Sequence, residues 1–161
     1  LEHHSDVCVR LSLERLARQA RDRGKDWSMG SEWVEDLIDG LVRTLLSMGL
    51  INLDLMDLRA IVQHQGRSTM LVGTGHQNQL DALYDATIKA PLAPMNVAGA
   101  KGCLLQIEGG MGMTIGQVDE IATALTSAVD SDAQVILGAR VSPDLEGVIR
   151  IVMLLAGIDE D

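Results

Sequence analysis

Three polar residues, Asn52, Asp54 and Asp57, follow a glycine about a third of the way along the chain, in the stretch GLINLDLMD over residues 49–57. Asp54 and Asp57 are three positions apart at the predicted start of a helix, so their side chains share one helical face. Such a carboxylate pair can orient a water molecule or a cation against a phosphate group. The chain offers no other group to complete such a site, so the phosphate would have to belong to another molecule.

The same two carboxylates also have a purely structural interpretation. Asp54 can cap the helix and Asp57 can complement the positive end of the helix dipole, each contributing about 0.3–1 kcal/mol. Acidic first turns are common, and from the spacing alone this structural interpretation is favoured.

Two glycine clusters are weaker candidates for phosphate binding. The segment 109–112 lies between a predicted strand and a predicted helix, which is the setting of a phosphate-binding loop. It lacks the Lys-Ser/Thr pair of a P-loop, and Glu108 beside it would repel a phosphate. A plain strand-to-helix turn is therefore predicted there, and the cluster Gly73-Thr74-Gly75 is a weaker candidate still.

Metal and nucleophile sites are not predicted. His64 and His76 are twelve positions apart with no cysteine at ligand spacing, so they are interpreted as surface or helix-end histidines. Cys8 and Cys103 lie in apolar runs and are interpreted as small core side chains. Two isolated cysteines fit a reducing, cytoplasmic compartment.

Length, charge and composition exclude several classes of protein. The 161 residues suit one domain with one core. The 13 basic against 23 acidic residues give a net charge of −10, which opposes nucleic-acid binding, and only 2% of the residues are aromatic. The longest apolar stretch is far too short to span a bilayer, so no direct membrane contact is predicted.

Apolar periodicity and capping residues predict the order of the elements. A capping box at Thr114–Gln117 begins one helix, with Val118, Ile121 and Leu125 on its buried stripe. The strands that flank this helix should be joined by a right-handed crossover. The pattern indicates one layer of helices against a mixed sheet. The other predicted helices cover 12–23, 31–48, 54–66 and 78–89, and the predicted strands cover 7–11, 101–108, 133–140 and 148–156.

The stretch GLINLDLMDLRAIV at 49–62 closely resembles the synergy loop and following helix of FtsZ, the tubulin-like family of cell-division GTPases. The likeness covers about residues 31 to 158 in unbroken order, which is far more specific than any single motif. It continues through GR at 66–67, GTG at 73–75, IKAPL at 88–92, GAKG at 99–102, IEGG at 107–110, MTI at 113–115, DAQVILGA at 132–139, PDLEG at 143–147 and LAGI at 155–158.

This resemblance implies an α+β fold, a two-layer helix/sheet sandwich with a mixed four-stranded sheet backed by helices and preceded by a long central helix. Residues 1–30 would be a remnant strand and basic helix of the nucleotide-binding domain, or an appended segment. Residues 31–48 would be the central helix, and 49–161 the C-terminal, GTPase-activating domain. The glycine-rich GTP-binding signature GGGTGSG is absent from the sequence, so this chain alone is expected to be inactive as a GTPase.

The resemblance also implies roles for individual residues. In the family, GTP lies between successive subunits of a filament, so Asp54 and Asp57 would place the attacking water at GTP held by a neighbouring subunit, with Mg²⁺ as a companion ion. Asn52 would shape the loop near the phosphates. Glu32 would contact guanine, although Ser12 stands where the family usually offers an asparagine, and Glu32 equally fits a solvated carboxylate in a helix first turn.

Two functions from different classes remain open. The chain is either the part of an FtsZ-like GTPase that promotes hydrolysis in an adjacent subunit, or a non-enzymatic module that caps a filament. A structural relative that only oligomerises is a third alternative. The expected partner is the nucleotide-binding domain of a neighbouring FtsZ-like subunit in a homo-oligomer or filament.

Overall fold

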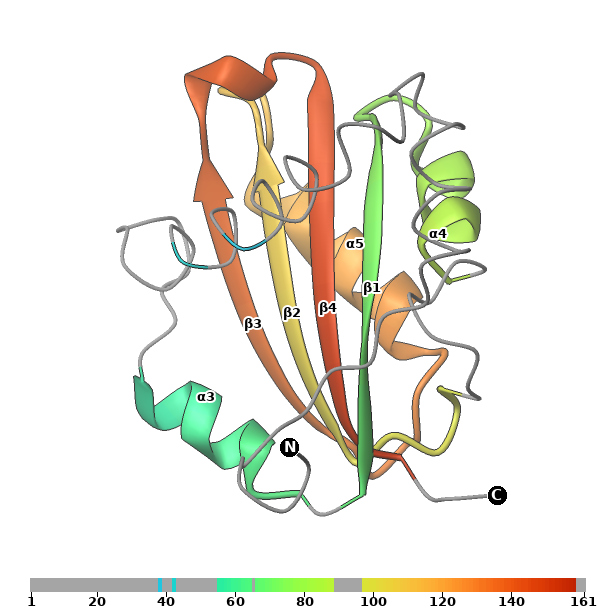
Figure 1. Ribbon diagram of the computed structural model, residues 1–161. Coiled ribbons are helices and arrows are strands. Elements are labelled where there is room, and N and C mark those ends of the chain that lie inside the picture. Colours follow the sequence, from blue (N-terminus) through green and yellow to red (C-terminus); the bar gives the residue numbers. More distant parts are fainter. Residues whose placement is uncertain (1–37, 39–41, 43–54, 65, 89–96, 159–161) are drawn as a thin grey trace, which may run out of the picture.

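The computed structural model describes residues 38, 42, 55–64, 66–88 and 97–158 (Figure 1). The predicted strand at 7–11 and helix at 12–23 therefore lie outside the described residues. Of the predicted helix at 31–48, only Ile38 and Val42 are described. Both are helical, and both are exposed.

The centre of the fold is a mixed sheet of four strands. The strands are β1 (Arg67–His76), β2 (Gly102–Gly109), β3 (Gln134–Val141) and β4 (Val148–Ile158), in the order β1-β4-β2-β3. Strand β4 pairs antiparallel with both β1 and β2, whereas β2 and β3 are parallel neighbours. The predicted mixed four-stranded sheet is thereby confirmed, and β2 and β3 are adjacent, as a crossover through a helix requires.

In the part of the chain from residue 55 to 158 that the structure describes, three α-helices accompany the sheet: α3 (Leu55–Val62), α4 (Leu80–Ile88) and α5 (Ile115–Thr126). Helix α5 crosses behind the strands in Figure 1, and α4 lies along β1 and contacts α5. A short 3₁₀ turn, Pro143–Leu145, joins β3 to β4. Among the described residues, no helix is long and apolar enough to cross a membrane.

The main core fills the space between the sheet and the layer of α4 and α5. Alternate residues of each strand point to this side, and the predicted stripe of α5 is buried against them. The cluster's fully buried members (Cys103 among them, as the sequence predicted) include Leu71, Leu83, Leu105, Ile107, Ile121, Leu125, Ile149, Ile151, Met153 and Leu155. These buried side chains hold α4 and α5 against the sheet through the hydrophobic effect.

The start of α5 follows the sequence prediction closely. Thr114 has extended backbone, and its hydroxyl oxygen accepts a hydrogen bond from the Gln117 backbone N–H at 3.1 Å. The Gln117 side-chain oxygen accepts in return from the Thr114 backbone N–H, also at 3.1 Å. This reciprocal capping box satisfies two backbone donors that would otherwise lack partners at the helix start.

Strand β1 was not predicted from the apolar pattern, because Gly73 and Gly75 resemble turn residues. In the structure both glycines lie under α4. A Cβ atom at position 73 would overlap the Thr87 hydroxyl, and one at position 75 would lie 3.4 Å from Leu83 side-chain atoms. The glycines therefore permit close packing of α4 on β1, and the GTG cluster is part of a strand and not a phosphate loop.

The opposite face of the sheet carries a second set of buried side chains, including Met70, Leu104 and Leu154. The C-terminal end of α3 approaches this face where β2 and β3 begin. Glu108 of β2 and Arg140 of β3 are register partners on the same face, and they form an ion pair with a 3.0 Å separation. Their side chains are only 9% and 15% exposed, so the pair is largely removed from water.

Candidate functional site

Asp57 is the predicted catalytic residue that the structure describes. It lies in the first turn of α3 and is partly buried. Ile61, one turn later on α3, is fully buried, so this part of the helix packs against the protein while Asp57 keeps part of its surface exposed. Asn52, Asp54 and Glu32 lie outside the described residues, so their positions stay predictions.

Helix α3 is attached to the sheet at its other end. Just after the helix, the Gln63 backbone N–H donates to the Arg59 carbonyl and the His64 N–H donates to the Ile61 carbonyl in a tighter turn, each at 3.2 Å. The His64 Nε2 atom lies 3.1 Å from the Gln134 side-chain oxygen at the start of β3. His64 thus links the end of α3 to the sheet. The sequence did not indicate this contact because His64 and Gln134 are far apart in the chain.

The glycine segment after β2 has a structural role. A Cβ at Gly110 would lie 2.5 Å from the Leu145 carbonyl oxygen and 2.7 Å from Glu146 Cα, so the turn passes directly against the connection between β3 and β4. The capping box already occupies N–H groups at the start of α5, which disfavours an anion site there. Both features agree with the predicted strand-to-helix turn.

The remaining chemical candidates of the sequence lie apart. His76 is exposed at the end of β1, whereas His64 is near the opposite end of the sheet. Within the part of the chain that the structure describes, no three His, Cys, Asp or Glu side chains group together as metal ligands. Burial raises the pKa of the Cys103 thiol to about 12, so this side chain is a neutral core group and not a nucleophile at neutral pH.

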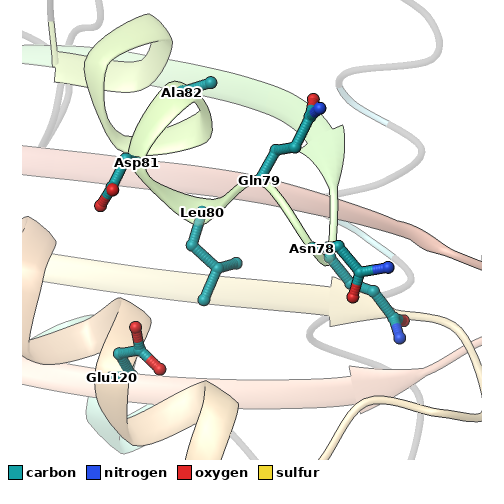
Figure 2. Close-up of a pocket in the computed structure, with 7 residues that line it drawn as sticks. Asn78, Gln79, Leu80, Asp81, Ala82 and Glu120 are labelled. Atoms are coloured by element: carbon teal, nitrogen blue, oxygen red, sulfur yellow. The ribbon is translucent and has the colours of Figure 1, made fainter.

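A surface hollow between α4 and α5 was missed by the sequence reasoning. Figure 2 shows the residues after β1 and the first turn of α4 on one side, and Glu120 of α5 on the other. Glu120 comes from a distant part of the chain, so no local spacing could have indicated it. The full lining comprises Gln77, Asn78, Gln79, Leu80, Asp81, Ala82 and Glu120.

The hollow is acidic and contains no nucleophile. Asp81 and Glu120 contribute carboxylates, and Tyr84 lies close enough for the negative charge of both to affect its pKa. Burial, then Glu120, then Asp81 raise the pKa of the Tyr84 phenol. The carboxamides and carboxylates of this hollow can accept hydrogen bonds from a cationic group. They do not form a general acid and general base aimed at a common point, as catalysis would need.

The fold is a two-layer α+β domain, as shown by the strand order, the parallel β2–β3 pair and the helices packed on the sheet. Its candidate catalytic group, Asp57, lies in the first turn of α3. The sequence matches the family model described as "FtsZ family, C-terminal domain" over residues 66–159. The chain therefore belongs to the FtsZ family and carries its C-terminal domain.

Individual relatives agree with this assignment. The chain is 32% identical to the cell division protein FtsZ of Caulobacter vibrioides over 164 aligned residues, which cover 99% of this chain and 32% of the relative. The chain thus spans about a third of the length of such relatives. The alignment takes in α3 and Asp57, which precede the segment matched by the family model.

Solved structures share the fold. An FtsZ dimer of M. jannaschii superimposes with a TM-score of 0.83 at 23% identity, covering 98% of this chain and 47% of that one. A TubZ of Bacillus thuringiensis serovar israelensis, solved as GDP-form protofilaments, gives a TM-score of 0.69 at 12% identity, covering 91% and 40%.

Proposed function

We propose that this chain is the GTPase-activating part of a cytoplasmic, filament-forming cell-division protein, and that it acts on GTP held by a neighbouring subunit. The observation that carries the proposal is the position of Asp57 in the first turn of α3, in a chain of the FtsZ family. The similarity to proteins solved as a dimer and as protofilaments supports assembly of subunits into a filament.

The chemistry required of Asp57 is modest. Phosphoryl transfer to water needs an aligned nucleophile and balanced charge, and not covalent chemistry by the protein. A carboxylate in the first turn of a helix is stabilised by the helix dipole and can accept a hydrogen bond from the attacking water. Asp54, three residues earlier, would hold the water from a second direction.

Repulsion between two carboxylates and a triphosphate must be offset. An aspartate oxygen is a hard ligand of the kind that Mg²⁺ accepts, so Asp57 fits a place beside a nucleotide-bound Mg²⁺. The ion would supply charge neutralisation at the phosphates, whereas the chain supplies orientation of the water. Positioned groups of this type contribute about 10²–10⁴ in rate.

The test adds the purified chain to an FtsZ-family protein kept below its polymerisation concentration, with GTP, and measures phosphate release. The wild-type chain should stimulate turnover, and Asp57→Ala should reduce the stimulated component by about 10²-fold or more. Asp57→Asn, which keeps the shape and removes the charge, should behave like Asp57→Ala. A matched control is Asp119→Ala, which removes an exposed carboxylate from α5.

Three results would lead to different conclusions. Equal losses for Asp57→Ala and Asp119→Ala would reject a specific role for Asp57. No stimulation by the wild-type chain would reject activation in trans. Reduced turnover together with shorter polymers in light scattering would instead assign the non-enzymatic capping function.

A further inference from the structure

Just beyond its C-terminal end, α3 is linked to the start of the parallel strands by contacts of His64. His64 follows the last turn of the helix, and its ring lies against Gly102 of β2. Its Nε2 atom is 3.1 Å from the side-chain oxygen of Gln134, the register partner of Gly102 on β3. We call His64, Gly102 and Gln134 together the histidine seat.

Glycine is required at position 102 because the His64 ring leaves no room for a side chain there, and not because of the backbone conformation. A Cβ added there would lie only 2.7 Å from His64 Cδ2, well inside van der Waals contact, and the strand carries no positive φ angle at this residue. Because strand residues alternate between faces, Gly102 faces α3, whereas Cys103 faces the main core. A methyl group at 102 would therefore displace the imidazole and leave the core side of the sheet unchanged.

The backbone of the other partner, Gln134, is hydrogen-bonded within the sheet. The Gln134 backbone N–H donates to the Lys101 carbonyl oxygen at 2.8 Å, at the first rung between β2 and β3. On the helix side, the His64 backbone N–H donates to Ile61, whose side chain is fully buried. The seat thus connects a fixed point on the sheet to a fixed point on the helix.

Asp57 lies in the first turn of α3, and His64 lies two residues beyond its last residue, Val62. At about 1.5 Å of rise per residue the two Cα atoms are about 10 Å apart, so a tilt of about 10° at the seat would move Asp57 by about 2 Å. Displacements of about 1 Å in a reacting group can cost on the order of 10²-fold in rate. Small changes at the seat are therefore magnified at the carboxylate.

We propose that the histidine seat sets the orientation of α3 and so places Asp57 to orient the water that attacks the neighbour's GTP, with His64, Gly102 and Gln134 as positioning residues. This inference rests on the proposed function for its catalytic consequence, whereas the orientation of α3 is a property of this chain alone.

The experiment uses three variants: one that should displace the ring, one that removes a single hydrogen bond, and one conservative substitution of the histidine. Gly102→Ala introduces the displacing methyl group, Gln134→Ala removes the hydrogen-bond acceptor from an exposed side chain, and His64→Gln keeps a terminal N–H donor. Gly99→Ala is the matched control, because a Cβ at Gly99 meets nothing within 4 Å. If Gly102→Ala does not fold, Gln134→Ala carries the test.

Two readouts are combined. Residual dipolar couplings of backbone amides report the axis of α3 relative to the sheet, and phosphate release reports stimulation of GTP turnover. We expect Gly102→Ala to reorient α3 and to lower the maximal stimulated rate about tenfold or more. The chain concentration giving half-maximal stimulation should stay within about threefold, because the loss is in orientation and not in association. Gln134→Ala should show a smaller change in the same direction, and His64→Gln should be near wild type.

The outcomes separate the two proposals. An unchanged α3 axis in both Gly102→Ala and Gln134→Ala would overturn the positioning inference, even if turnover fell. A reoriented axis with an undiminished stimulated rate would overturn it as well. If the wild-type chain fails to stimulate turnover but α3 reorients in the variants, the proposed function fails and the structural role of the seat stands.

Discussion

Replacing Gly73 with alanine tests the close packing of α4 on β1, the feature that hid β1 from the sequence pattern. The new Cβ would overlap the Thr87 hydroxyl and lie 3.0 Å from Thr87 Cβ. Thr87 is fully buried, and its hydroxyl donates a hydrogen bond to the Leu83 carbonyl at 2.8 Å. The Thr87 side chain therefore cannot move away from the new methyl group without disturbing α4.

The expected cost combines two effects. Overpacking a well-packed core costs about 1–3 kcal/mol, and loss of a buried hydrogen bond with an unsatisfied partner costs about 1–3 kcal/mol. Gly73→Ala should therefore lower the free energy of unfolding by about 2–6 kcal/mol. This is a large part of the 5–15 kcal/mol that is typical of a domain.

Urea denaturation followed by circular dichroism measures this loss, with Gly99→Ala as the control that should stay within about 0.5 kcal/mol of wild type. Thr87→Ala removes the hydroxyl that the new methyl would strike. The double variant should therefore be at least about 1 kcal/mol more stable than the sum of the single losses predicts. Equal stability of Gly73→Ala and Gly99→Ala, or strict additivity with Thr87→Ala, would refute the reasoning.

Two further predictions concern stability. Thr114→Ala removes the capping box of α5 and should cost about 1 kcal/mol in urea denaturation, whereas Thr123→Ala, at an exposed position inside the same helix, should be neutral or slightly stabilising; equal effects would argue against the cap. Burial raises the pKa of Cys103 from 9.0 to about 12, so the folded state retains a proton that the unfolded chain releases above pH 9. The stabilising contribution is complete below pH 9 and is lost as the pH rises from 9 to 12, by about 1.4 kcal/mol per pH unit. In a background with Cys8→Ser, Cys103→Ala should abolish this part of the alkaline slope, and an unchanged slope would contradict the assignment.

Much of the fold was predictable because local and long-range preferences agree. The apolar runs of β2 and β4 are buried along nearly their whole length, and the capping box at Thr114 defines the start of α5. Helix α4 begins at Leu80, two residues after the predicted start. In these segments the hydrophobic pattern, the caps and the turns all indicate the same structure.

Strand β1 shows where such reasoning ends. Its glycines are unfavourable in an isolated strand, but the close approach of α4 requires them. That requirement arises from a contact between segments, so no local propensity contains it. The contact of His64 with Gln134, seventy positions away, could not be predicted for the same reason.

The candidate site was predictable in one respect. The first-turn position of Asp57 followed from the helix pattern and is confirmed, whereas the roles of Asn52, Asp54 and Glu32 stay predictions. The acidic hollow between α4 and α5 was missed because its lining joins the start of α4 to Glu120 on a separate helix. Its position depends on how the two helices pack.

The most direct test of the account compares Asp57→Asn with the wild-type chain in GTP turnover by an FtsZ-family protein kept monomeric. Asp57→Asn preserves side-chain size, so folding and association should be retained while the stimulated rate falls about 10²-fold or more. A stimulated rate equal to that of wild type, at equal occupancy of the partner, would contradict the claim that this carboxylate acts on the neighbour's nucleotide.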